Sequence, residues 1–90
     1  MSSDDEDLWP VLPSEIVADA LADPAVPAEV FSAVAALTVA ICEDPWLSGS
    51  DQVGTDPDWR EILIPKGLGI AEYRVSPQDQ HVILTRIVLF

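Results

Sequence analysis

The spacing of hydrophobic residues changes about halfway along this 90-residue chain. In the first half, hydrophobic positions recur at intervals of four, three and four, at Val30, Val34, Leu37 and Ile41. This spacing is typical of one face of a helix. From Trp59 onward the interval becomes two, which is typical of strands. Helices followed by a run of strands predict an α+β fold in which the helices pack on the sheet.

Two helices joined as a hairpin are predicted in the first half. The first follows Pro13-Ser14-Glu15, because Ser14 can cap the free amides and Glu15 suits the positive end of a helix. It ends at Asp23-Pro24 after about two turns. The second begins at Pro27, since proline fits the first turn, and runs to about Cys42.

A short edge strand is expected ahead of the helices, at Leu8–Leu12, where Pro10 cannot donate to a ladder. The segment Trp46–Asp58 is rich in Gly, Ser, Asp and Pro and is interpreted as a loop. A three-stranded antiparallel meander follows it, with strands at Trp59–Ile64, Leu68–Val75 and His81–Phe90. Pro65-Lys66-Gly67 and residues 76–80 form its two turns.

The length suits one small domain, predicted over residues 8–90, after an acidic disordered tail at residues 1–7. No apolar run approaches the roughly 18 residues that span a membrane. The acidic start differs from the basic start of a secretory signal, so we expect a cytoplasmic protein. One cysteine excludes an internal disulfide, and without a Cys/His cluster we expect neither metal nor cofactor.

Charge divides the chain unevenly. The first 59 residues hold 13 of the 16 carboxylates and no lysine or arginine, whereas all four basic residues follow: Arg60, Lys66, Arg74 and Arg86. A net charge of −12 makes nucleic acid an unfavourable partner and favours a basic or apolar protein segment. The exposed strand at Phe90 and an apolar sheet face also suggest a homodimer.

Simple register in both hairpins predicts a candidate binding surface. With Ile64 opposite Leu68 and Val75 opposite His81, alternation places four charged residues on the sheet face that the helices leave open: Arg60, Glu72, Arg74 and Arg86. Trp59, Leu63 and Ile83 then face the helices. The surface could hold an anion or a carboxylate. Alternatively, its members simply form ordinary cross-strand ion pairs, such as Arg60 with Glu72.

The order of strand, two helices and three-stranded meander resembles the RelE/ParE-like toxin fold of bacterial toxin–antitoxin modules. The resemblance covers Leu8 to Phe90 and includes the second helix ending at Glu43-Asp44-Pro45-Trp46 and the segment Glu72-Tyr73-Arg74-Val75. It implies a sheet face or helix groove that binds an antitoxin-like protein segment. RelE-like ribonucleases carry catalytic basic residues on that face, but the matching positions hold Ile70 and Phe90 here.

Three functions follow from these observations. The first is an interaction module that resembles a catalytically degenerate RelE/ParE-like toxin. The second is an active toxin-type ribonuclease that inhibits translation, with Arg60, Arg74 and Arg86 stabilising the transition state and Glu72 as base. The third is an acidic decoy for a basic protein. His81 is interpreted as a residue flanking a turn, and Cys42 as a buried, inert thiol.

Overall fold

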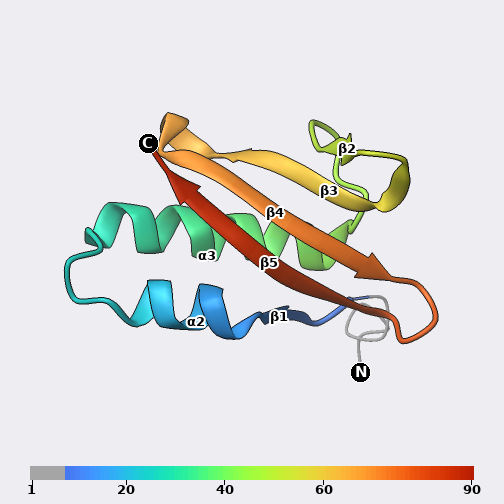
Figure 1. Cartoon of the computed structure of the whole chain (residues 1–90), viewed down its shortest axis with the longest axis horizontal. Coiled ribbons are helices and arrows are strands. Elements are labelled where there is room, and N and C mark those ends of the chain that lie inside the picture. The colour runs from blue at the N-terminus through green and yellow to red at the C-terminus, as the bar shows by residue number, and fades with distance from the viewer. Residues whose placement is uncertain (1–7) are drawn as a thin grey trace, which may run out of the picture.

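A five-stranded sheet with two helices on one face makes up the fold in the computed structural model, which describes residues 8–90 (Figure 1). The predicted tail at residues 1–7 lies outside the described residues. The elements follow the predicted order, with one added strand: β1 (Val11–Pro13), α2 (Glu15–Ala22), α3 (Ala28–Glu43), β2 (Asp51–Val53), β3 (Asp56–Ile64), the 3₁₀ turn η1 (Pro65–Gly67), β4 (Gly69–Ser76) and β5 (His81–Leu89). The α+β class is thus confirmed.

The helices begin and end where the local signals predict. The Ser14 hydroxyl accepts a hydrogen bond from the Val17 amide at 3.2 Å and caps α2. After α2, the Asp23 carboxylate accepts from the Ala25 amide at 2.9 Å, which stabilises the turn into α3. Pro27 stands at the start of α3. The two helices run antiparallel behind the sheet (Figure 1).

Strand β1 connects the helices to the sheet. It pairs in parallel with β5, beside which α2 then continues. Ser14 fixes this junction, because its amide donates to the Leu84 carbonyl at 2.9 Å and its hydroxyl donates to the Thr85 carbonyl at 3.1 Å. One serine therefore caps α2 and provides hydrogen-bond donors for two carbonyl groups at the edge of β5, where β1 ends.

The sheet has the order β1-β5-β4-β3-β2, so it contains one strand more than predicted. The added strand, β2, lies within the predicted loop and pairs with β3 through a tight turn at Gly54, whose φ is +63°. Its sequence, Asp51-Gln52-Val53, contains no alternation of apolar residues. A strand this short and polar gives no periodic signal, which is why the sequence predicted only a loop.

The predicted register was wrong by one residue in both hairpins. Ile64 pairs with Gly69 instead of Leu68, because η1 and Leu68 together form a longer turn in which Lys66 takes a left-handed φ of 68°. His81 pairs with Ser76 instead of Val75. A further irregularity between Glu72 and Tyr73 shifts the rest of β5 by one more residue.

The core lies between the helices and the sheet. Its buried hydrophobic residues come from α2, α3, β3, β4 and β5: Val17, Val30, Ala33, Val34, Leu37, Ile41, Ile64, Ala71, Tyr73, Val75, Val82 and Leu84. The corrected register places alternate residues of β4, such as Ala71, Tyr73 and Val75, toward the helices. No helix within residues 8–90 has both the length and the apolar character to cross a membrane.

Candidate binding surface on the open sheet face

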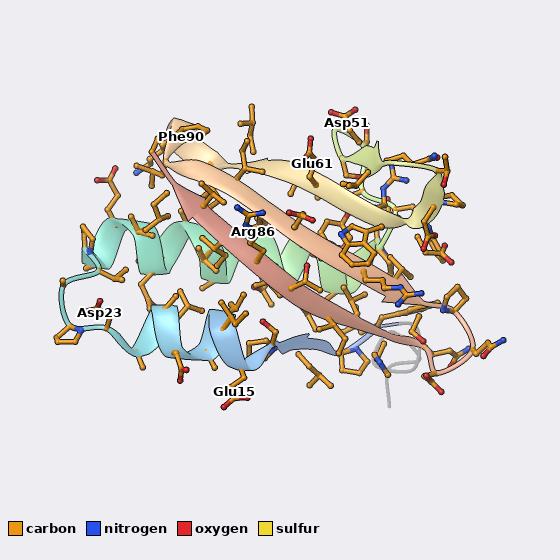
Figure 2. All side chains as sticks on the ribbon, in the orientation of Figure 1. Glu15, Asp23, Asp51, Glu61, Arg86 and Phe90 are labelled. Atoms are coloured by element: carbon orange, nitrogen blue, oxygen red, sulfur yellow. The ribbon has the colours of Figure 1, made fainter. Side chains whose placement is uncertain are left out.

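The sheet face away from the helices carries three rows of side chains that cross the strands. Cross-strand partners share a face, so the register defines each row. The first row is apolar and contains Leu63, Ile70 and Val88. The second is charged and contains Asp51, Glu61, Glu72 and Arg86. The third is mixed and contains Trp59, Arg74, Ile83 and Leu12. Figure 2 labels three members of the charged row, Asp51, Glu61 and Arg86, each on a different strand.

The charged row places three carboxylates in line across adjacent strands. Glu61 lies opposite both Asp51 and Glu72. Of these three carboxylates, only Glu72 forms an ion pair with any of residues 8–90, with 3.9 Å between its carboxylate and the Arg86 guanidinium. Like charges directly opposite one another destabilise a sheet. Among residues 8–90, Asp51 and Glu61 form no ion pair. The row therefore has an excess of negative charge at its β2 and β3 end.

Trp59 connects the charged row with the mixed row. Its indole Nε1–H donates to Glu72 Oε1 at 2.9 Å, and the Arg74 guanidinium lies 5.6 Å from the centre of its ring. Arg74 also lies 3.9 Å from an Asp56 carboxylate oxygen. The chain of contacts from Arg86 through Glu72, Trp59 and Arg74 to Asp56 holds both open-face arginines beside carboxylates. Neither guanidinium is thus an isolated positive charge.

The apolar row exposes large side chains to solvent. Leu63 is 62% exposed and Val88 is 39% exposed, with Ile70 between them. A shallow hollow of about 280 Å³ lies here, lined in part by Glu61, Leu63 and Ile70. Leu12, which belongs to the mixed row at the β1 edge of the same face, adds further apolar surface and is 47% exposed. Apolar side chains grouped beside charges are typical of surfaces that contact other proteins.

Arg60 does not belong to this surface. The prediction paired it with Glu72 on the open face, but its partner is the fully buried Tyr73, so it points toward the helices. The one-residue difference in register reverses the faces of the β3 residues. Of the four predicted members, the structure brings together Glu72, Arg74 and Arg86.

The Arg60 guanidinium instead ties the loop before β2 to β3. Its Nε donates to the Ser50 hydroxyl at 2.7 Å, and its other two nitrogens donate to the carbonyls of Ser50 and Pro57, at 2.9 and 3.0 Å. All three nitrogens are engaged. The side chain therefore has the geometry of a structural clamp, because each of its three nitrogens donates a hydrogen bond within the fold.

Tyr73 lies beside this clamp with its hydroxyl fully buried. The hydroxyl makes no hydrogen bond with the described residues. Burial raises the pKa of Tyr73 above its ordinary value of 10.0, while the nearby Ser50 hydroxyl and Arg60 guanidinium lower the pKa and reduce this shift. The phenol is therefore neutral at physiological pH.

Sequence reasoning also misplaced Trp59, Leu63 and Ile83. It placed them against the helices, whereas the register puts all three on the open face. This error concealed the position of Trp59 on the open face, where it joins Glu72 to Arg74. Its position follows from Arg60 facing inward, since neighbours in a strand face opposite ways. No feature of the sequence indicated whether Trp59 or Arg60 points toward the helices.

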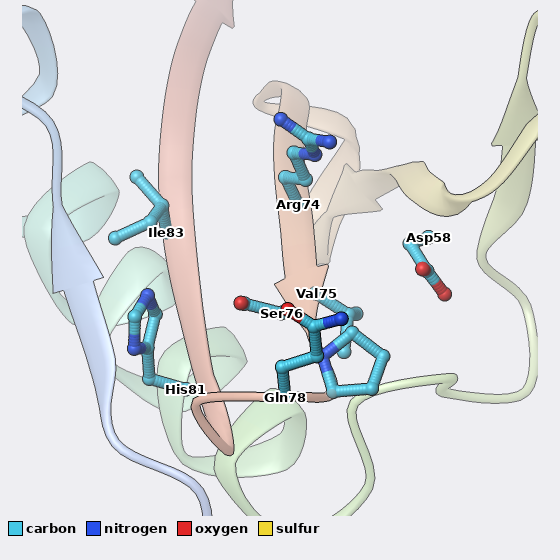
Figure 3. A pocket seen from close by; sticks show the side chains of 8 residues that line it. Asp58, Arg74, Val75, Ser76, Gln78, His81 and Ile83 are labelled. Carbon is cyan, nitrogen blue, oxygen red and sulfur yellow. The ribbon is translucent and has the colours of Figure 1, made fainter.

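A second hollow lies at the turn between β4 and β5 (Figure 3). It is open, has a volume of about 560 Å³, and is lined by Asp58, Arg74, Val75, Ser76, Pro77, Gln78, His81 and Ile83. Arg74 and His81 lie at opposite ends of it in Figure 3. The Ser76 hydroxyl donates to the Asp79 carboxylate at 3.0 Å instead of to His81, so these residues do not form a nucleophile and base pair.

Within residues 8–90, no three His, Cys, Asp or Glu side chains gather closely enough to hold a metal ion. No family model, no curated protein and no solved structure matches this chain. The residues of the open sheet face define a surface that combines exposed apolar area with two carboxylates, Asp51 and Glu61, that form no ion pair with any of residues 8–90.

Proposed function

We propose that this protein is a small, non-enzymatic interaction module that binds a basic and apolar protein segment on its open sheet face. The observation that carries the proposal is the charged row, in which Asp51 and Glu61 form no ion pair with any of residues 8–90. A positively charged side chain placed over these two carboxylates would relieve their mutual repulsion. The overall charge of −12 would speed the approach of such a partner.

The three rows also indicate the pattern of the partner segment. Neighbouring rows are two residues apart along a strand, which is about 6.6 Å. Residues four apart on a helix rise by about 6 Å. A helix lying along the strands would thus place an apolar residue over Leu63 and Ile70, and a Lys or Arg four residues away over Glu61. An extended segment would reach the same rows with every second residue.

The proposal agrees with the resemblance to RelE/ParE-like toxins, because a relative of these toxins without catalytic residues would keep only the binding surface. The geometry offers less support to the ribonuclease alternative. That mechanism needs cations free to stabilise a phosphoryl-transfer transition state. Arg60 faces the helices with all its nitrogens engaged, and Arg74 and Arg86 each lie 3.9 Å from a carboxylate. Induced expression that cleaves transcripts would restore the ribonuclease alternative.

A display library of random peptides selected on the full chain tests the proposal. We expect the enriched peptides to carry Lys or Arg flanked by apolar residues at the spacings given above. Glu61→Lys should weaken their binding by at least about tenfold, because it places a positive charge in the row. Asp19→Lys on α2 changes the net charge equally, away from the sheet, and serves as the matched control.

Binding should also weaken as salt increases, because screening reduces the attraction between the acidic face and a basic segment. Selection of mainly acidic peptides would contradict the proposal. So would a Glu61→Lys variant that binds as tightly as the Asp19→Lys variant.

A further inference from the structure

The hollow beside the apolar row combines two carboxylates with an apolar wall, and its size suits one side chain of a bound segment. It has a volume of about 280 Å³ and is lined by Gly49, Asp51, Glu61, Ile62, Leu63 and Ile70. At about 30 Å³ for each molecule of liquid water, this volume corresponds to roughly nine water molecules. The hollow therefore has room for one long side chain but not for a helix or a strand.

Two carboxylates form the polar end of the hollow. Asp51 and Glu61 are direct cross-strand partners, so their Cβ atoms lie about 4.5–5.5 Å apart. Neither forms an ion pair with any of residues 8–90, and Glu61 is half-buried. Solvent ions screen a partly buried charge less than an exposed one. The best match for this pair is a cation that can donate hydrogen bonds to both carboxylates at once.

The other end of the hollow is apolar and opens at the edge of the sheet. Strand β2 pairs with β3 only as far as Glu61, so Ile62 and Leu63 lie beyond that pairing, and β2 covers only one end of β3 (Figure 1). Within residues 8–90, apart from Gly49 and its two neighbours, no atom lies within 4 Å of the position that a Cβ atom would take at Gly49. A side chain can therefore enter past Gly49 and lie against Ile62 and Leu63. This path leaves Ile70 to an apolar residue of the segment.

We propose that the hollow holds an arginine side chain of the bound segment, an inference that rests on the proposed function. The aliphatic stem lies against Ile62 and Leu63, and the guanidinium group donates to Asp51 and Glu61. Arginine fits this site better than lysine for two reasons. Its planar fork of five donors can bond two carboxylates together, and its weakly hydrated charge loses less hydration in a partly apolar hollow.

The arginine makes a demand on the partner that the proposed function does not make. Attraction to the acidic face requires only positive charge, which lysine supplies equally well. A side chain seated in a pocket instead acts as an anchor and carries a large share of the binding free energy. Exchange of arginine for lysine in the segment therefore separates the two.

Isothermal titration of the full chain with a peptide selected on the wild type tests the anchor. Alanine in place of the anchoring arginine should weaken binding by at least about 100-fold, and lysine should weaken it by at least about tenfold. Citrulline, which keeps the shape of arginine without its charge, should behave like alanine. Alanine in place of any other basic residue of the peptide should weaken binding by less than about threefold.

Variants of the hollow test the same contact from the side of the protein. Glu61→Gln should weaken binding of the peptide by at least about tenfold, because it removes one of the two charged acceptors. Leu63→Thr should weaken it by about threefold, because it removes apolar contact with the stem. Asp19→Asn on α2 and Val39→Thr on α3 make matching changes at exposed positions outside the sheet and should bind like the wild type.

A small probe tests the hollow without any peptide. Butylguanidinium chloride, titrated into the isotope-labelled full chain, should shift the amide resonances of Gly49, Glu61 and Leu63 with a dissociation constant on the order of millimolar. Butylammonium chloride is the matched control and should bind at least about threefold more weakly.

Two results would overturn the inference and leave the proposed function intact. One is a lysine peptide that binds within about twofold of the arginine peptide. The other is butylguanidinium that shifts no resonance of the hollow, or shifts them no more than butylammonium does. Selection of mainly acidic peptides is a different failure, because it would overturn the proposed function and, with it, the arginine anchor.

Discussion

The two faces of the sheet use arginine in opposite ways. On the covered face, Arg60 is half-buried and makes three hydrogen bonds of 3.0 Å or less. On the open face, Arg74 and Arg86 are exposed and approach their carboxylates only to 3.9 Å. Well-formed, partly buried hydrogen bonds stabilise a fold, whereas loose exposed ion pairs contribute little. Arg60 therefore stabilises the fold, whereas Arg74 and Arg86 contribute little to its stability.

The strongest test of this difference is Arg60→Ala. The substitution removes the clamp on Ser50 and leaves that residue's buried polar groups without their charged donor. Hydrogen bonds to charged groups are worth about 1.5–3 kcal/mol, so we expect the free energy of unfolding to fall by about 2–3 kcal/mol. Urea titration followed by circular dichroism measures it. Arg60→Lys should be intermediate, because an ammonium cannot reach Ser50 and Pro57 together.

A loss of stability in Arg60→Ala no larger than that in Arg86→Ala would contradict this difference between the two faces. In that case the arginines of the covered and open faces would contribute equally to stability, and the hydrogen bonds from Arg60 to Ser50 would add nothing to the free energy of unfolding.

The helices could be predicted from the sequence because their signals are local. The Ser14 cap and the Asp23-Pro24 break act within a few residues of where they occur, and the structure agrees with both. Strand β2 could not be predicted in this way. It is held by pairing with β3 and has no apolar alternation of its own. Its existence depends on contacts that a local pattern does not contain.

The candidate surface could be predicted only in part, because faces depend on turn geometry. Leu68 belongs to the first turn and not to the strand, which reverses the faces of the β3 residues and moves Arg60 to the helix side. Arg86 stayed on the predicted face for a different reason. The second hairpin is shifted by one residue, and the irregularity beside Glu72 shifts β5 by one more. A total shift of two residues returns a side chain to its original face, so Arg86 remains on the open face.

A smaller loss is expected when the centre of the open-face network is removed. Glu72→Ala takes away the acceptor of the Trp59 indole and the partner of Arg86. We expect the free energy of unfolding to fall by about 1 kcal/mol, mainly from the indole hydrogen bond. Glu72→Gln keeps an acceptor for Trp59 and should lose less than half as much. Equal losses in the two variants would show that the charge of Glu72 matters more than its hydrogen bond.

Tyr73 extends the comparison to alkaline pH. Because burial raises its pKa in the folded chain above the ordinary 10.0, the folded state holds the phenol proton more tightly than the unfolded state does. This contribution to stability is fully present below pH 10.0 and is lost as the pH rises through the folded pKa. We therefore expect the free energy of unfolding to fall above pH 10.0 in the wild type.

Tyr73→Phe isolates that effect. The hydroxyl has no hydrogen-bond partner among the described residues, so its removal should leave stability at neutral pH unchanged or raise it by up to about 1 kcal/mol. The variant should also lose the part of the alkaline decline that Tyr73 causes. Urea titrations of both proteins at neutral and alkaline pH provide the measurement. A clear loss at neutral pH would mean that the hydroxyl is satisfied in solution.

Arg86→Ala should change stability little but should affect binding on the open face. The side chain is 66% exposed and its ion pair is long, so we expect a loss of at most about 0.5 kcal/mol. Binding of a basic segment should instead improve, by about two- to fivefold, because Glu72 then joins Asp51 and Glu61 as a carboxylate without a cation. Isothermal titration with a peptide selected on the wild type measures the change. Weaker binding in this variant would mean that Arg86 contacts the partner directly, and the segment would then carry an acidic residue at that position.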